Sequence, residues 1–120
     1  MIERIPGLPE NVLGFAASGR VTADDYESVL IPAVESVLAR RAKVRFLYHI
    51  RKDCSGFEAG AMWDDAKVGL RHLTSWERVA VVTDTEWIRA AVKVFGILMP
   101  GHVRVFNDGE LDQATRWVSE

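Results

Sequence analysis

Apolar residues follow two different spacings along this chain, and the spacing separates predicted strands from predicted helices. Short apolar runs, which are typical of buried or half-buried strands, occur at 2–5, 12–18, 44–50, 78–82 and 103–106. Apolar positions that recur every three or four residues predict helices at 22–38, 59–73 and 87–99. The same spacing predicts a last helix that carries Leu111, Ala114 and Val118.

Polar residues and one proline mark where the predicted helices begin and bend. Thr22 with Asp25 three residues later has the pattern of a capping box, and Thr83 with Glu86 repeats it. Pro32 removes one backbone donor from the first helix, so we expect a kink or a restart at its neighbour Ile31.

Strands and helices alternate after an initial pair of strands, in the order β-β-α-β-α-β-α-β-α. Parallel strands need long crossover connections, which the intervening helices supply, whereas the first two strands are close enough for an antiparallel hairpin. We therefore predict an α/β fold with a single mixed, mostly parallel β-sheet of about five strands and four helices. The 120 residues are expected to form one domain, 1–120.

Charge and composition narrow the classes of function. A net charge of −2 does not favour a nucleic-acid partner. The basic residues around strand 44–50 are interpreted as solvated strand ends rather than an anion site; they are Arg40, Arg41, Lys43, Arg45, Arg51 and Lys52. A single cysteine cannot form an internal disulfide, the first residues lack the apolar core of a signal peptide, and no apolar stretch has the length of a transmembrane segment. These features predict a cytoplasmic protein.

The segment 52–60, KDCSGFEAG, is predicted to be a polar loop between a buried strand and a helix. Cys54 needs a lowered pKa, and Ser55 needs an adjacent base, before either can act as a nucleophile. Nothing in the sequence directs His49 toward them, the loop lacks a nucleotide-binding glycine motif, and the histidines lack the spacing of a metal site. We therefore expect no enzymatic activity, no metal and no cofactor.

Helix 87–99 is predicted to carry more apolar surface than the sheet can cover. Toward its end, helix 87–99 is apolar all round, so another subunit, a neighbouring helix or a hydrophobic ligand must cover its second face. In helix 59–73, Trp63 lies beside the apolar face, while the adjacent Asp64 and Asp65 are expected on the solvated side. Self-association is the favoured interpretation, and a lipid-like ligand is the alternative.

Three parts of the sequence together resemble the SpoIIAA-like family of small bacterial proteins. They are GLPENV at 7–12 with GRVTADDY at 19–26, WERVAVVTD at 76–84 with the following WI, and FG at 95–96 with MPG at 99–101 and VRVF at 103–106. The resemblance covers essentially the whole chain. It implies the fold shared by STAS domains, which act as phosphorylation-switched partners of anti-sigma kinases, and by CRAL-TRIO domains, which carry hydrophobic small molecules.

The resemblance also implies a role for the segment 53–56. In anti-sigma-factor antagonists the loop after the third strand carries Asp-Ser-Ser-Gly, and its second serine accepts a phosphate. Asp53, Cys54, Ser55 and Gly56 have the same frame, with Cys54 as the departure, so the resemblance implies Ser55 as the phosphoacceptor. A plain turn is the leading alternative.

Together these observations predict a non-enzymatic regulatory or protein-interaction domain that associates with itself as a homodimer or binds another protein. The alternative is a carrier of a hydrophobic small molecule, held between helices 59–73 and 87–99 and the sheet. The residues predicted to form this partner or ligand surface are Phe57, Met62, Trp63, Trp87, Phe95, Leu98 and Met99.

Overall fold

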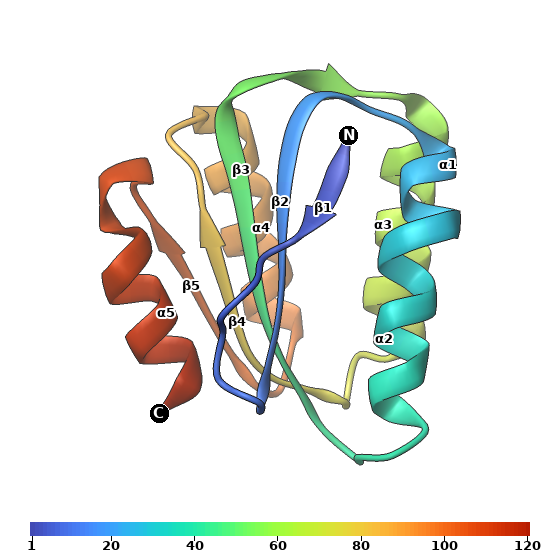
Figure 1. The fold of residues 1–120 in the computed structure, drawn as a ribbon, viewed down its shortest axis with the longest axis vertical. Helices are drawn as coiled ribbons and strands as arrows, with labels where there is room; N and C mark the ends of the chain where they lie inside the picture. Colours follow the sequence, from blue (N-terminus) through green and yellow to red (C-terminus); the bar gives the residue numbers. More distant parts are fainter.

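The computed structural model describes residues 1–120, apart from the side chain of Leu70. Strands and helices follow one another in the predicted order (Figure 1). The strands are β1 (Ile2–Arg4), β2 (Val12–Val21), β3 (Val44–Phe57), β4 (Trp76–Val82) and β5 (His102–Phe106). The helices are α1 (Ala23–Asp25), the π-helical turn η1 (Tyr26–Leu30), α2 (Ile31–Leu38), α3 (Ala59–Arg71), α4 (Glu86–Leu98), the 3-10 turn η2 (Asp108–Glu110) and α5 (Leu111–Ser119).

The strands form one mixed sheet in the order β1-β2-β3-β4-β5. β1 is antiparallel to β2, and every later neighbour is parallel. Because each strand pairs with the next one in the chain, and parallel crossovers are right-handed, successive crossover helices fall on the same face. α2, α3 and α4 cover that face, and α5 lies on the opposite one (Figure 1). The predicted α/β fold with a single mixed sheet is confirmed.

Each face of the sheet has its own core, because alternate residues of a strand point to opposite faces. Phe46 and Tyr48 of β3 belong to the larger core, together with the fully buried Val34 of α2. Leu47, which lies between them in the sequence, packs instead with Val118 of α5. The larger core borders the candidate site.

The first helical segment runs without a break from α1 through η1 to α2. The hydroxyl of Thr22 accepts from the Asp25 amide at 3.1 Å, and the Asp25 carboxylate accepts from the Thr22 amide at 2.8 Å, which confirms this capping box. Pro32 has no amide hydrogen, and the turn before it widens until the amide of Ile31 reaches the carbonyl of Tyr26, five residues back. The predicted restart at Ile31 is thus the end of a π-helical turn.

The second predicted capping box is wrong. α4 begins after Thr85, and the hydroxyl of Thr83 accepts from the Thr85 amide at 3.1 Å rather than from Glu86. The reason is that Thr83 is still held by the sheet, since it is buried and its amide donates to the Phe106 carbonyl.

β3 is longer than predicted, because it continues beyond Ile50 through most of the segment expected to be a loop. Cys54 pairs with Gly19 and Phe57 pairs with Val21, so β2 and β3 extend together past the other strands (Figure 1). The register shifts on either side of Gly19 absorb the mismatch in length between the two strands.

The loop prediction for Asp53, Cys54 and Gly56 is therefore wrong. Their small and polar side chains are typical of a turn, but pairing with the end of β2 satisfies backbone groups that a loop would leave to solvent. Gly56 has a φ of 149°, a conformation that residues with a side chain rarely adopt, so glycine suits the strand here as well as it suits a turn. The strand ends at Phe57, and Glu58 is the N-cap of α3.

Candidate functional site

An apolar cavity of about 450 Å³ lies between α3, α4 and the sheet. Its floor consists of side chains from β3 and β4 that alternate along each strand and therefore point to the same face: Phe46, Tyr48, Ile50, Val79 and Val81. The ring of Phe46 meets those of Tyr48 and Trp76 edge-on, with centroids 5.8 and 5.6 Å apart, so neighbouring aromatic rings hold the floor in place.

The walls of the cavity come from two helices. On α4 the lining residues recur at helical spacing and include Trp87, Ala91 and Leu98, and on α3 they include Met62 and Ala66. Most of the surface they offer is apolar, and Trp87, Met62 and Leu98 are about half or more exposed to solvent. The cavity is therefore open to solvent along a hydrophobic edge.

A chain of three polar side chains lies within this apolar surround. The hydroxyl of Tyr26 is 2.9 Å from that of Tyr48 and donates to the Asp65 carboxylate at 3.0 Å. Since Tyr26 has only one hydroxyl hydrogen, and it is used toward Asp65, Tyr48 must be the donor in the bond between the two tyrosines. All three residues line the cavity, and we refer to them as the Tyr–Tyr–Asp chain.

Desolvation sets the protonation states of the Tyr–Tyr–Asp chain. Burial, followed by the nearby Asp65 charge, raises the pKa of Tyr26 well above its usual value, and burial likewise raises the pKa of Tyr48. The Asp65 residue is exposed on the surface of α3, yet desolvation of its carboxyl group beside Tyr26 raises its pKa, while the hydrogen bond from Tyr26 opposes that shift. The tyrosines thus stay neutral and present hydrogen-bonding groups rather than charges.

Five of the seven predicted surface residues are brought together by the fold, since Phe57, Met62, Trp87, Phe95 and Leu98 all line the cavity. The rings of Phe57 and Trp87 meet edge-on at 6.4 Å and join the end of β3 to the start of α4.

Trp63 and Met99 lie elsewhere. Trp63 is 65% exposed on α3, outside the cavity, with the Lys67 ammonium 6.0 Å from its ring centre. Met99 is only 5% exposed, so its prediction as a surface contact is wrong. The backbone of Met99 is already extended after α4 ends, which turns its side chain into the larger core.

The structure separates the two carboxylates that the sequence placed together on a solvated side. Asp64 is 5% exposed, because α3 packs its Ala61–Asp64–Val68 side inward, toward α1 and η1. One Asp64 oxygen lies 3.6 Å from the Lys67 ammonium, and among the described residues the other has no hydrogen-bond partner. Asp65, one position further around the helix, reaches the cavity instead.

Ser55 is exposed on the extension of β3, three residues before the N-cap of α3. It is therefore not placed at the helix N-terminus, where the dipole would stabilise a phosphate. His49, the nearest histidine in the sequence, points away from Cys54 and Ser55 to a different partner, with its ring nitrogen 2.8 Å from the Asp108 carboxylate. The role of Ser55 as a phosphoacceptor stays a prediction.

Sequence reasoning did not find the Tyr–Tyr–Asp chain. The signal was that the chain has only two tyrosines, one within predicted helix 22–38 and one within apolar run 44–50, and a buried tyrosine hydroxyl needs a partner. In the part of the chain that the structure describes, no three His, Cys, Asp or Glu side chains gather as metal ligands would. None of the described helices has the length and apolar composition to cross a bilayer.

Comparison with known proteins gives a match to a family and similarity to solved structures. A family model described as SpoIIAA-like matches residues 12–119. The crystal structure of a protein from Shewanella loihica PV-4, described as an uncharacterized member of the DUF3478 family with a SpoIIAA-like fold, is 30% identical in sequence. The match covers 98% of this chain and 93% of the other, with a TM-score of 0.78. No curated protein matches the chain.

Proposed function

The chain belongs to the SpoIIAA-like family, and we propose that it is a non-enzymatic domain that binds a hydrophobic small molecule between α3, α4 and the sheet. The observation that supports this proposal is the apolar cavity of about 450 Å³ with the Tyr–Tyr–Asp chain inside it. Small-molecule sites are typically apolar cavities of about 300–1,000 Å³ with a few convergent polar groups. The cavity thus favours the carrier over the interaction module that the sequence favoured.

The Tyr–Tyr–Asp chain narrows the class of ligand. The Asp65 carboxylate disfavours an anionic head group and accepts hydrogen bonds. The neutral tyrosine hydroxyls, whose hydrogens are used within the chain, offer a ligand only acceptor lone pairs. A ligand with an apolar body and one neutral hydrogen-bonding group, such as a hydroxyl, matches these walls and this polar chain. A fatty acid anion does not.

The proposal is tested by placing a large side chain in the cavity at an exposed helix position, so that the buried core is not changed. Ala91→Phe adds a ring inside the cavity, because Ala91 lines it and is exposed, and Ala90→Phe adds the same ring at the exposed neighbouring position outside it. With the neutral dye N-phenyl-1-naphthylamine as the probe, we expect saturable fluorescence enhancement in the wild type and in Ala90→Phe, and its loss in Ala91→Phe. Equal enhancement in all three proteins would contradict the proposal.

Self-association is the second candidate, and a separate set of exposed residues on α4 supports it. Val94, Ile97 and Leu98 are 60%, 83% and 63% exposed, which is unusual for large apolar side chains that lie so close together. Val94 and Leu98 line the cavity, but Ile97 does not, so a substitution of Ile97 tests self-association without changing the cavity. Ile97→Asp should abolish a dimer in sedimentation velocity while the dye still binds; a monomeric wild type would contradict self-association.

A further inference from the structure

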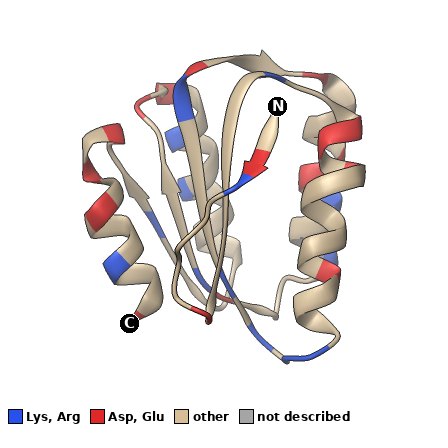
Figure 2. Cartoon of the chain, viewed as in Figure 1, with Lys and Arg blue, Asp and Glu red and all other residues tan. Residues whose placement is uncertain are grey.

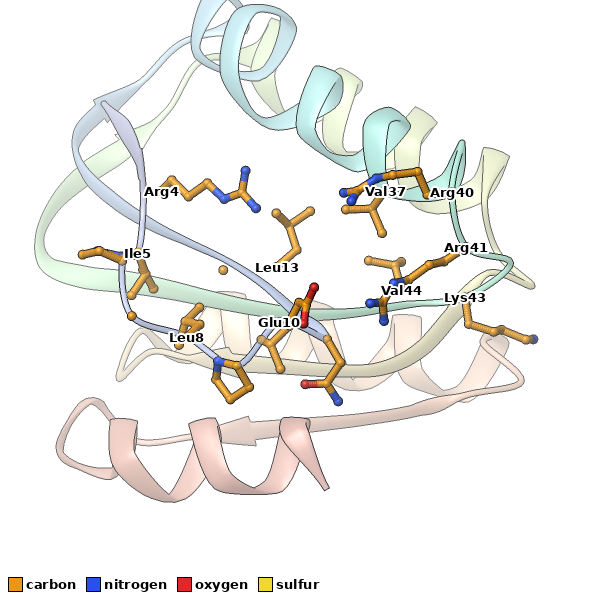
Figure 3. Close-up of a pocket in the computed structure, with 16 residues that line it drawn as sticks. Arg4, Ile5, Leu8, Glu10, Leu13, Val37, Arg40, Arg41, Lys43 and Val44 are labelled. Carbon is orange, nitrogen blue, oxygen red and sulfur yellow. The ribbon is translucent and has the colours of Figure 1, made fainter.

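A second cavity, of about 500 Å³, lies at the amino-terminal ends of β2 and β3 (Figure 3). The loop between β1 and β2 forms one wall, and the end of α2 with the turn that follows it forms the other. Its apolar lining includes Ile5, Leu8, Leu13, Val37 and Val44. It shares no lining residue with the first cavity.

Three arginines surround this cavity. Arg4 comes from β1, and Arg40 and Arg41 come from the turn after α2, so residues far apart in the sequence bring their charges together. Figure 3 shows Arg4 and Arg40 reaching toward each other from opposite walls, while Lys43 points away. The Lys43 ammonium instead donates to the Thr74 carbonyl at 2.7 Å.

The positive charge of these arginines is not neutralised within the protein. Among the described residues, no carboxylate lies within 4.0 Å of Arg4, Arg40 or Arg41. Glu10 is the one acidic residue in the cavity lining. Arg40 uses its Nε to donate to the Ser36 carbonyl at 3.3 Å, which leaves its terminal nitrogens available.

The structure thereby divides the basic residues that the sequence grouped together as solvated strand ends. Arg45 is paired, since its Nε is 2.6 Å from the Glu77 carboxylate and its Nη1 donates to the Val118 carbonyl. Arg40 and Arg41 lie at the other side of the turn, where Figure 2 shows basic residues at the end of the molecule that holds this cavity. A hollow with uncompensated charge on a chain of net charge −2 points to an anionic ligand.

We propose that this second cavity binds a small amphipathic oxyanion, namely a phosphate or carboxylate attached to a short apolar body. Guanidinium groups form paired, charge-assisted hydrogen bonds with such oxyanions, and the apolar lining accommodates the body. The ligand class is the opposite of that of the first cavity, where Asp65 disfavours anions. The proposal is independent of the first one, and either can fail alone.

The probe is octyl phosphate, which is titrated into the full chain and followed by calorimetry. Inorganic phosphate and octanol, which carry only its charged group and only its apolar body, are titrated as controls. We expect octyl phosphate to bind more tightly than either of these two, and its binding to weaken as salt is raised. The double variant Arg4→Gln/Arg41→Gln should weaken it about tenfold or more, since two charge-assisted contacts are removed. Arg116→Gln, an exposed arginine on α5, is the matched control and should leave binding unchanged.

A second variant makes the test independent of any loss of stability. Glu10→Gln removes the carboxylate that repels the anion, so octyl phosphate should bind more tightly, whereas Glu3→Gln on the exposed side of β1 should have no effect. Vesicles of phosphatidylcholine with and without phosphatidic acid show whether the anion belongs to a lipid or to a soluble molecule. Membrane binding that requires both phosphatidic acid and Arg4 indicates a lipid head group. Binding of octyl phosphate without membrane binding indicates a free metabolite. Binding that is unchanged in both Arg4→Gln/Arg41→Gln and Glu10→Gln overturns the proposal.

Discussion

Tyr26→Phe tests how much the Tyr–Tyr–Asp chain contributes to the stability of the fold. The substitution removes one oxygen from a side chain that is 1% exposed, and with it the 3.0 Å bond to Asp65 and the 2.9 Å bond from Tyr48. Asp65 can replace its lost donor with water because it is exposed, but Tyr48 is 7% exposed and its hydroxyl is left without an acceptor. A buried group that loses its partner costs about 1–3 kcal/mol.

We therefore expect Tyr26→Phe to lower the free energy of unfolding by about 2 kcal/mol. In urea unfolding followed by circular dichroism, this corresponds to a midpoint about 1 M lower at a typical slope of about 2 kcal/mol per M. Tyr48→Phe leaves the bond between Tyr26 and Asp65 intact, so it should cost less, about 1 kcal/mol.

The double variant Tyr26→Phe/Tyr48→Phe tests whether the two hydroxyls are coupled. When both hydroxyls are absent, no buried hydroxyl is left unpaired, so Tyr26→Phe/Tyr48→Phe should cost clearly less than the sum of the two single variants. Additive losses, or a Tyr26→Phe protein as stable as the wild type, would show that the two hydroxyls do not form the coupled chain described here.

Three further predictions concern pH, packing and the first helix. Because the pKa of Asp65 is raised in the folded state, its ionisation lowers the stability of the fold as the pH rises. Asp65→Asn should therefore be more stable than the wild type at neutral pH, and the two proteins should be equally stable in acid. Thermal melts between pH 3 and 7 measure this difference. Gly101→Ala would place a methyl group against the backbone carbonyl of Trp76 and should cost about 1–3 kcal/mol or more in urea unfolding, whereas Gly109→Ala meets nothing within 4 Å and should be nearly neutral. Thr22→Ala removes the cap of α1 and should cost about 1 kcal/mol, unlike Thr22→Ser, which keeps the hydroxyl and should melt like the wild type.

Much of the architecture could be predicted because local patterns agree with the final contacts. The spacing of apolar residues gave the order of strands and helices, and Pro32 gave the position of the widened turn. The extension of β3 could not be predicted, because Asp53, Ser55 and Gly56 are poor strand formers and only pairing with the end of β2 makes them a strand.

Part of the candidate site could also be predicted from local patterns in the sequence. The apolar excess on α4 predicted that something must cover it, and Phe95 and Leu98 do face a cavity. The Tyr–Tyr–Asp chain joins residues 22 and 39 positions apart, and no local spacing links such residues. Met99 was misplaced because its side chain direction depends on where the helix stops, which is the least certain feature of a periodic pattern.

The sequential order of the sheet has a consequence for how the chain is made. Each strand pairs with the one synthesised just before it, so the sheet can grow one strand at a time with short loop closures, and the helices of the larger core can pack as they emerge. On the opposite face no helix packs against the sheet until α5 is complete, so Leu47, Ala80 and Val82 remain without a covering helix on the nascent chain. The nine residues of α5 therefore decide how long a newly made chain remains prone to aggregation.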